Sequence, residues 1–299
     1  MNSEERFNFL KVKLERELII PKDKPDETVD ATIKALWFAS IGLPVSAEQA
    51  ETLPLPELSE LQVESLDKLL EQRLNNKPLA HITGRQNFMG IEMIADYRAL
   101  IPRKETEILG RRALELSYQL AQQKHRVKVL DMGCGGGNLG LAIAYFNPNT
   151  EIYASDNSVE AIELTRENIA FLKLDDRFHT SLGDLFNPFE SEEFYEQFDL
   201  IVCNPPYIST AMIPNLMSEI SDHEPEQAFD GGTFGINLVK RLITESPRFL
   251  TRPGWLIFEI GVGQGPFMKQ MCKNINRFYQ VESVNDSNGI MRAILARKQ

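Results

Sequence analysis

The sequence predicts an α/β protein in which a doubly wound parallel sheet follows a small helical domain. From Glu4 to about Leu74, apolar residues recur at three- and four-residue spacing, which is the period of amphipathic helices. After Glu105, short apolar runs of strand length alternate with helical patterns, as in βαβ units. The first of these runs leads into a glycine-rich loop and a helix, an arrangement typical of nucleotide-binding folds.

Length, composition and charge narrow the class of protein. The chain has 299 residues, which is long for one core and favours two domains. Apolar residues make up 42% and charged residues 25%, as in ordinary folded proteins. Because 43 acidic residues face only 32 basic ones, the net charge of −11 opposes attraction to phosphate backbones. Nucleic acid is therefore disfavoured as a partner.

The cysteines and the apolar runs indicate a cytoplasmic protein. The three cysteines are an odd number without CxxC spacing, so we predict neither disulfides nor a metal site. The first residues, MNSEERFNFL, are acidic where a signal peptide is basic. No stretch approaches the roughly 18 apolar residues of a membrane span, and we expect no membrane contact.

Each segment of the predicted architecture has its own pattern. We assign residues 1–78 to a helical domain, punctuated by prolines and lacking a cluster of catalytic residue types, so its expected role is substrate recognition. We read residues 79–104, with Gly84 and Gly90 between short apolar stretches, as a β-hairpin connector. Residues 105–299 follow as the catalytic domain, with a helix to about Gln122 and strands at Val127–Leu130, Ile152–Ala154, Phe198–Cys203 and Trp255–Ile260.

The glycine loop and two acids point to a nucleoside cofactor. The segment Gly133–Gly137 lies between a strand and a helix, where glycines allow a sharp turn and a close approach of ligand to backbone. Gly135, Gly137 and Gly140 also satisfy GxGxxG, so an NAD site stays open on the glycines alone. Asp156 ends the next strand and suits the ribose of either cofactor. Asp131 would repel a pyrophosphate but tolerates the cationic groups of S-adenosylmethionine, which favours methyl transfer. The alternative is a glycine turn with a solvated aspartate.

The run NPPY follows directly on the strand Phe198–Cys203 and suits a planar nitrogen acceptor. The lone pair of an amide nitrogen is delocalised, so its hydrogens must be held by two acceptors. The Asn204 side-chain oxygen and the Pro205 carbonyl are suitable, because proline offers C=O without a competing N–H. Tyr207 can cover the flat face of the acceptor. The alternative is a strand-ending turn with a core tyrosine.

Seven ordered motifs resemble the HemK/PrmC family of protein-(glutamine-N5) methyltransferases, which modify the Gln of Gly-Gly-Gln in peptide chain release factors. They are HITGRQNFMG, LIPRKETEIL, DMGCGGG, GDLFNPF, NPPY, EPEQAFDGG and FEIGVGQG. The resemblance implies a class I S-adenosylmethionine-dependent methyltransferase with a Rossmann-like seven-stranded sheet, a helical N-terminal domain and a β-hairpin connector. It implies a release factor as the protein partner and S-adenosylhomocysteine as the product. We also expect the protein to be a monomer.

The resemblance also completes the candidate site. The predicted catalytic and substrate-binding residues are Asn204, Pro205, Pro206 and Tyr207. The predicted cofactor-binding residues are Asp131, Gly133, Cys134, Gly135, Gly136, Gly137, Asp156, Asn157, Asp184, Leu185 and Asn204, with Asp184 and Leu185 flanking the adenine.

Departures from the family pattern keep other substrates open. Lys104 replaces a usual proline, and Phe234 stands where an acidic residue is common. The alternatives are another protein glutamine, as in a ribosomal protein, a small-molecule amide or amine, and the exocyclic amine of a flipped nucleic-acid base. An NAD-dependent oxidoreductase would leave NPPY without a purpose. A catalytically silent binding module would not explain the presence of all these motifs.

Overall fold

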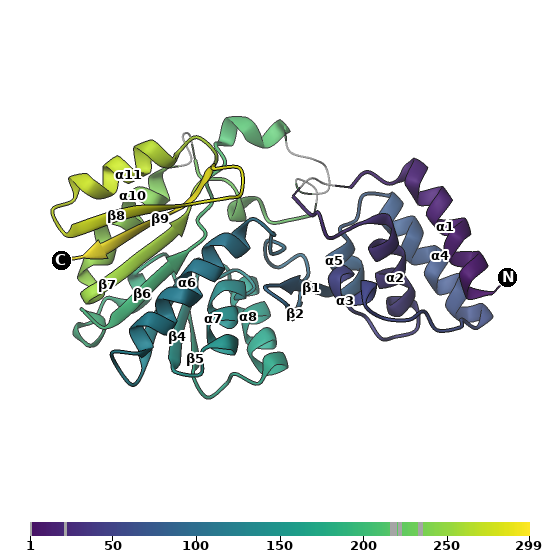
Figure 1. The fold of residues 1–299 in the computed structure, drawn as a ribbon, viewed down its shortest axis with the longest axis horizontal. Coiled ribbons are helices and arrows are strands. Elements are labelled where there is room, and N and C mark those ends of the chain that lie inside the picture. Colours follow the sequence, from purple (N-terminus) through teal and green to yellow (C-terminus); the bar gives the residue numbers. More distant parts are fainter. Residues whose placement is uncertain (1, 21–22, 216–219, 221–222, 233–235) are drawn as a thin grey trace. The chain divides into compact units, whose positions relative to one another are not determined.

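The chain folds into two compact units. The computed structural model describes residues 2–20, 23–215, 220, 223–232 and 236–299. The N-terminal unit comprises Met1–Tyr97, Ile101–Lys104 and Leu216–Glu224, and the sheet unit comprises Arg98–Leu100, Glu105–Asn215 and Pro225–Gln299 (Figure 1). The domain limits drawn from the sequence at residues 78 and 104 stay a prediction. No helix of the described residues has the length and apolar content needed to cross a membrane.

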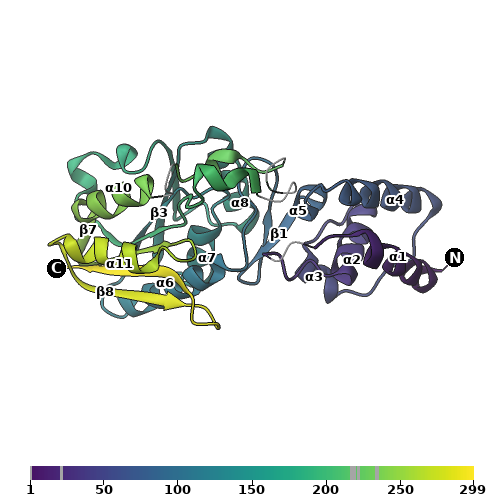
Figure 2. The same ribbon diagram turned by 90° about the horizontal axis from the view of Figure 1, so that it is seen from above.

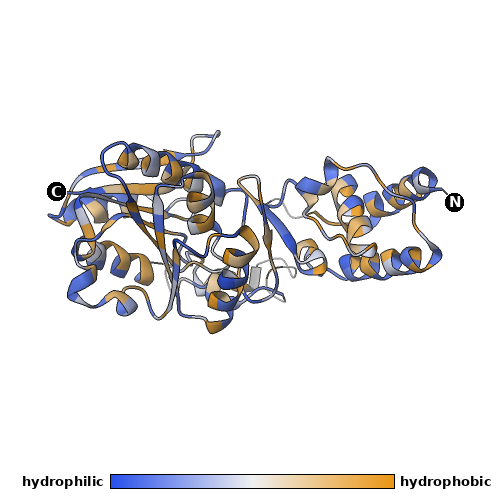
Figure 3. Cartoon of the chain, turned by 90° about the horizontal axis from the view of Figure 1, so that it is seen from below, coloured by the Kyte–Doolittle hydropathy of each residue, from blue (hydrophilic) through white to orange (hydrophobic). Residues whose placement is uncertain are grey.

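The N-terminal unit is built from short capped helices. Asn2, Thr28, Ser46 and Ser59 each accept a backbone N–H with their side chain, which satisfies a donor that the first helical turn leaves open. Figure 3 shows apolar and polar stretches alternating along these helices, and their apolar faces bury a core that includes Leu14, Leu36, Trp37 and Leu66. The helices are α1 (Ser3–Glu17), α2 (Val29–Ser40), α3 (Ala47–Glu51), α4 (Glu60–Leu74) and α5 (Leu79–Thr83).

A two-stranded hairpin follows α5 in the same unit. Gly84 ends the helix in the left-handed region, which glycine enters without strain. Strands β1 (Arg85–Phe88) and β2 (Ile91–Ile94) pair antiparallel, and their connecting residues Met89 and Gly90 both have positive φ. That is the conformation of the tight turns whose twist matches a hairpin.

The sheet unit contains seven strands in the order β5-β4-β3-β6-β7-β9-β8. Figure 2 shows β3, β7 and β8 of this sheet from above. The strands are β3 (Val127–Met132), β4 (Thr150–Asp156), β5 (Phe178–Leu182), β6 (Phe198–Cys203), β7 (Leu250–Glu259), β8 (Phe278–Asn285) and β9 (Met291–Lys298). The predicted fold class is confirmed, with one correction: β9 runs antiparallel to both neighbours. The turn between β8 and β9 is too short for the crossover that a parallel pair requires.

Helices cover both faces of this sheet. Helix α6 packs on α7, and α7 on α8, while α10 packs on α11. Every residue of β6 is buried, so this central strand lacks the alternation of a half-exposed strand. The helices are α6 (Thr106–Ala121), α7 (Asn138–Phe146), α8 (Val159–Leu172), α10 (Asn237–Glu245) and α11 (Gly265–Asn274), and the 3₁₀ turns are η1 (Asn187–Phe189), η2 (Glu192–Phe194), η3 (Thr210–Asn215), η4 (Glu226–Ala228) and η5 (Ser246–Arg248).

Gly140 lets α7 approach the sheet. A Cβ atom added there would lie 2.9 Å from Asp131 Oδ2 and 3.0 Å from side-chain atoms of Ile152 and Phe178. The Gly140 N–H donates to Asp131 Oδ2 at 2.7 Å, so this close approach also holds the aspartate. The third glycine of the GxGxxG pattern therefore serves helix–sheet packing.

We expect Gly140→Ala to lower the free energy of unfolding. Overpacking costs about 1–3 kcal/mol, and the better helix propensity of alanine offsets at most about 1 kcal/mol of it. The expected net loss is about 1–2 kcal/mol by urea unfolding. Tyr145→Phe, at a half-exposed position of the same helix, is the control and should stay within about 0.5 kcal/mol of the parent. Unchanged stability of Gly140→Ala would show that α7 moves away freely.

Candidate active site

The register of four parallel strands brings the candidate residues to one edge of the sheet. Met132 in β3 pairs with Ser155 in β4 and Cys203 in β6, and Cys203 pairs with Phe258 in β7. The next residues along these strands are Asp156, Gly133, Asn204 and Glu259. Since neighbouring strands lie about 4.8 Å apart, Asp156 and Asn204 are separated by about 10 Å. This edge lies where the strand order reverses, between β3 and β6, the usual ligand position in open α/β sheets.

The glycine loop has a backbone that other residues would strain. Gly133, Gly135 and Gly137 all have positive φ. A Cβ on Gly137 would also lie 2.9 Å from the Leu141 side chain, whereas a Cβ on Gly133 would meet nothing within 4 Å. Gly133 is exposed, so the loop backbone is open there to a ligand.

Side chains from α8 hold the loop in this shape. The Thr165 hydroxyl donates to the Gly135 carbonyl at 2.7 Å, and the Asn168 side-chain amide donates to the Gly136 carbonyl at 3.0 Å. The Cys134 N–H donates to the Ser155 carbonyl at 3.0 Å, which ties the loop to β4. These three hydrogen bonds hold the loop against α8 and β4.

Asp156 lies at the end of β4 with both carboxylate oxygens engaged by backbone. Oδ2 accepts the Gly135 N–H at 2.9 Å and Oδ1 accepts the Ser158 N–H at 3.0 Å. Burial raises its pKa, and these hydrogen bonds act in the opposite direction. Each oxygen retains a lone pair for a hydroxyl, which is what a ribose requires. Asn157, the next residue, is exposed beside it.

Asp131 is buried, not solvated, with only 1% of its surface exposed. Its Oδ1 atom is buried and accepts no hydrogen bond from the described residues, while Oδ2 accepts the Gly140 N–H. Burial raises the pKa of Asp131 to about 7, and the charge of Asp156 adds to the rise. A cationic group beside Oδ1 would supply the missing partner and favour the ionised form. The residue therefore fits the ammonium or sulfonium of S-adenosylmethionine, and disfavours a pyrophosphate.

The two residues predicted to flank adenine differ in what they offer. Asp184 is exposed, and its carboxylate pairs with Arg241 at 2.7 Å. The Leu185 side chain is buried in the main core of the sheet unit, and its φ is +46°. A ligand at this loop would therefore meet the Leu185 backbone, not its side chain.

Asn204 has a fixed side chain with one open acceptor. Its Nδ2 donates to the Thr106 hydroxyl at 3.3 Å. Its Oδ1 atom is buried and accepts no hydrogen bond from the described part of the chain. A buried acceptor without a donor is unfavourable by about 1–3 kcal/mol, so the arrangement is suited to a donor brought by a ligand.

Tyr207 is held at its hydroxyl and at its backbone. The hydroxyl lies 3.2 Å from Glu105 Oε1 and 3.1 Å from Glu259 Oε1. The Tyr207 carbonyl accepts from the Gln264 side-chain amide at 3.1 Å. Since Thr106 holds Asn204 and Glu105 contacts Tyr207, adjacent residues at the start of α6 contact both ends of NPPY.

The comparisons with known proteins agree with this geometry. Residues 113–236 match the family model "Methyltransferase small domain". A release factor glutamine methyltransferase of Thermodesulfovibrio yellowstonii is 33% identical over 81% of this chain and 84% of its own length. The chain belongs to the release factor glutamine methyltransferase family. The corresponding protein of Geobacter sulfurreducens is 33% identical over 77% of this chain and 76% of its own.

The predicted family and enzyme class are thus confirmed, and a solved structure supports the fold. The hMettl16 catalytic domain in complex with a MAT2A 3′UTR hairpin has a TM-score of 0.54, covering 69% of this chain and 75% of that one. Its sequence identity is 14%, so this likeness concerns the fold alone.

Sequence reasoning missed four residues of this glutamine methyltransferase site. Glu259 and Gln264 lie in FEIGVGQG, and Glu105 and Thr106 lie in LIPRKETEIL. Both motifs entered only as parts of the family resemblance, and no role was assigned to these four residues. The signal was present in the glutamates, but only the fold places them against Tyr207.

The cysteines of this site carry no nucleophile. Cys134 and Cys203 are buried and free of disulfides. Burial raises the pKa of both thiols, and the charges of Asp131 and Asp156 raise it further. Both therefore stay neutral thiols, as expected for small apolar substitutes in the loop and strand.

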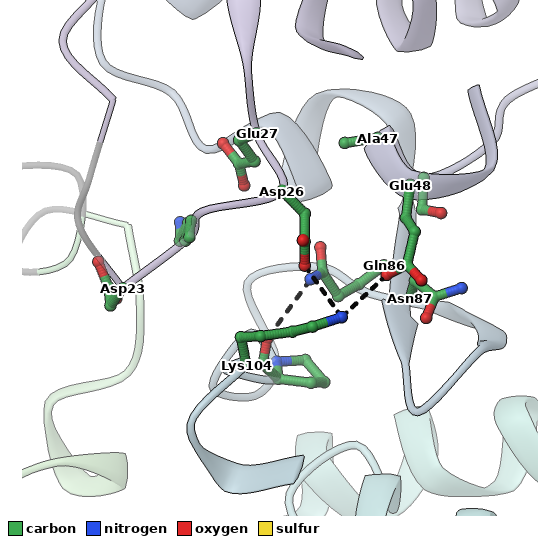
Figure 4. Close-up of a pocket in the computed structure, with 11 residues that line it drawn as sticks. Asp23, Asp26, Glu27, Ala47, Glu48, Gln86, Asn87 and Lys104 are labelled. Atoms are coloured by element: carbon green, nitrogen blue, oxygen red, sulfur yellow. Dashed lines mark hydrogen bonds and ion pairs between the residues drawn. The ribbon is translucent and has the colours of Figure 1, made fainter. Parts of the chain in front are cut away.

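Lys104, a departure from the family pattern, lies in the N-terminal unit. Its ammonium pairs with Glu48 at 3.1 Å and Asp26 at 3.2 Å, on the wall of a polar pocket (Figure 4). On the same wall, Gln86 donates to the Pro102 carbonyl. Lysine thus adds two ion pairs that proline could not make. Phe234, the other departure, lies outside the described residues.

We expect Asp156→Ala to bind S-adenosylhomocysteine about ten- to a hundredfold more weakly, because a charged acceptor for two hydroxyls is lost. Calorimetric titration measures this. Asp156→Asn keeps one acceptor oxygen for the loop, so its affinity for S-adenosylhomocysteine should lie between those of the parent and Asp156→Ala. Glu160→Ala, an exposed acid on the following helix, is the control. If Asp156→Ala bound as tightly as the parent, Asp156 would not belong to the site.

Proposed function

We propose that this chain transfers a methyl group from S-adenosylmethionine to the side-chain amide nitrogen of a protein glutamine, the Gln of Gly-Gly-Gln in a peptide chain release factor. The single observation that carries this proposal is the buried, unsatisfied Oδ1 of Asn204 at the end of β6. The names of the relatives support the same substrate. Because release factors act in translation, the proposed reaction takes place in the cytoplasm.

The residues of NPPY provide what an amide acceptor needs. Asn204 is oriented by Thr106, so its Oδ1 accepts one amide hydrogen without reorganising. The Pro205 carbonyl accepts the other in the proposed arrangement, and the nitrogen lone pair then faces away from both acceptors. The bound cofactor supplies a methyl group on a positively charged sulfur. As the new C–N bond forms and the C–S bond breaks, the nitrogen releases one hydrogen as a proton.

We further propose that the row from Asp131 to Leu185 binds the cofactor. Asp131 contributes an open, buried oxygen for a cation, and Asp156 contributes acceptors for the ribose hydroxyls. The exposed backbone of Gly133 follows Asp131 at the end of β3, and the strand register places it beside Asp156. The loop of Asp184 and Leu185 follows β5, next to β4, which suits an adenine placed beyond the ribose.

The helical residues 1–78 are proposed to recognise the protein substrate. Phe9 and Val12 on α1 and Leu61 on α4 are exposed apolar side chains. Protein interfaces bury residues of this kind. The functional groups described above, from Asp131 to Glu259, all belong to the sheet unit.

We expect Asn204→Ala to lower single-turnover methyl transfer by about 10²–10³, the usual effect of losing one preorganised group at a reacting centre. Its affinity for S-adenosylmethionine should stay within a few fold. Asn204→Asp keeps the acceptor oxygen and should retain more activity than Asn204→Ala.

The measurement is intact mass of a release factor after incubation with enzyme and S-adenosylmethionine, at saturating cofactor. A release factor with Gly-Gly-Ala in place of Gly-Gly-Gln is the matched control and should gain no methyl group. A single methyl on the parent and none on the control supports the proposal. Methylation of both, or a near-normal rate for Asn204→Ala, would refute it.

A further inference from the structure

The Tyr207 hydroxyl faces two carboxyl groups and has only one hydrogen. Glu105 Oε1 and Glu259 Oε1 lie 3.2 Å and 3.1 Å from its oxygen. A phenol donates one hydrogen bond and accepts through its lone pairs. If both glutamates were ionised, one carboxylate would face a lone pair at hydrogen-bond distance. A second proton, on one of the two glutamates, would give each of these two contacts its own hydrogen.

The surroundings decide which glutamate holds that proton. The Glu105 side chain is 32% exposed and forms an ion pair with Arg292 at 3.1 Å. Glu259 is only 3% exposed, and no hydrogen bond from the described residues reaches its Oε2 atom. A buried carboxylate oxygen without a donor is unfavourable, whereas the carbonyl oxygen of a neutral acid tolerates burial better.

The groups around Glu259 agree with this assignment. Burial raises the pKa of Glu259 to about 7, and the charge of Glu105 adds to the rise. The Thr106 hydroxyl, then the Tyr207 hydroxyl and Arg292, lower the pKa of Glu259, but burial outweighs them. Arg292 is itself shared with Asp286 at 3.0 Å, which partly occupies its charge. With the proton on Glu259, its carboxyl donates to the Tyr207 hydroxyl, the Tyr207 hydroxyl donates to Glu105, and Arg292 also donates to Glu105.

The segment after β7 also holds the backbone and ring of Tyr207. Gln264 donates to the Tyr207 carbonyl and accepts the Gly261 N–H at 3.0 Å. A Cβ on Gly261 would lie 3.1 Å from the Tyr207 ring, so the strand end packs directly against it. Glu259 thus belongs to a clamp, residues 259–264, that fixes the last residue of NPPY.

We propose that Glu259 is a positioning residue, whose protonated carboxyl donates to the Tyr207 hydroxyl and thereby holds the NPPY turn in its methyl-accepting geometry. The proposal deepens the proposed function and rests on it for the meaning of NPPY. Ionisation of Glu259 removes the donated hydrogen and places a second negative charge against Tyr207. Turnover should therefore fall as pH rises through about 7.

The same ionisation affects stability with a defined sign. The pKa of folded Glu259 lies above its ordinary value of 4.5. A group with a raised folded pKa contributes stability that is fully present below the ordinary value and is lost as pH rises through the folded value. Asp131 also has a raised pKa, so the contribution of Glu259 is the difference between the parent profile and that of a Glu259 variant.

The test compares Glu259→Gln with Glu259→Ala. Glutamine keeps a hydrogen-bond donor at all pH values, so Glu259→Gln should retain turnover at pH 6. Between pH 6 and 8.5 its turnover should decline much less than that of the parent. Glu259→Ala should lower turnover by about 10² at every pH, the scale expected when a reacting group is misplaced. The loss should fall on kcat, with affinity for S-adenosylhomocysteine within a few fold. Glu163→Gln, at an exposed position of α8, is the matched control and should follow the parent.

The dependence of unfolding free energy on pH tests this proposal independently of the proposed substrate. Urea unfolding of the parent and Glu259→Gln between pH 5 and 8.5 requires no acceptor. A flatter profile in Glu259→Gln supports a protonated Glu259 even if no release factor is methylated. Tyr207→Phe combined with Glu259→Gln should behave like Tyr207→Phe alone, because Glu259 acts through the Tyr207 hydroxyl. A parent-like pH dependence in Glu259→Gln, or a turnover as low as that of Glu259→Ala, would overturn the proposal.

Discussion

The parallel pairing of β4, β3, β6 and β7 is the constraint on which the site depends. Its register ends these four strands in one row, so that Asp156, Gly133, Asn204 and Glu259 follow them at the same edge. Each strand is fixed by burial of its neighbours, and a shift by one residue would send every side chain to the other face. The site is therefore as rigid as the core beneath it, which positions groups better than loops alone would.

At this edge the protein keeps polar atoms that its own fold leaves unsatisfied. Asp131 Oδ1, Asn204 Oδ1 and Glu259 Oε2 are buried and accept no hydrogen bond from the described residues. Each is unfavourable by about 1–3 kcal/mol, yet all three lie on neighbouring strands. Buried polar atoms usually have a partner, so these atoms fit partners brought by ligands for Asp131 and Asn204, and a neutral carboxyl with its proton on Oε1 for Glu259. These atoms lower the stability of the folded protein, and ligands that supply their hydrogen-bond partners would gain the corresponding binding free energy.

Helix α6 couples the sheet edge to the acceptor turn. Its N-cap Glu105 and its first residue Thr106 contact Tyr207 and Asn204, the last and first residues of NPPY. Single substitutions in this network should therefore not be additive, since each residue orients the next. The sequence alone could not reveal it, because Glu105 and Glu259 are distant in the chain and a lone glutamate before a helix has an ordinary explanation in the helix dipole.

The sequence by itself determined the fold class, the glycine loop, the strand-ending Asp156 and NPPY, because strand and helix periods and the demands of glycine and proline are local properties. Only the tertiary structure decided what lies across from these motifs. It made β9 antiparallel to its neighbours. It also buried Asp131, for which the sequence had left a solvated position open. It also turned the Leu185 side chain into the core and placed two glutamates on one tyrosine hydroxyl. Burial and pairing between distant segments depend on how strands and helices assemble, and burial raises the pKa of Asp131 and Glu259 to about 7.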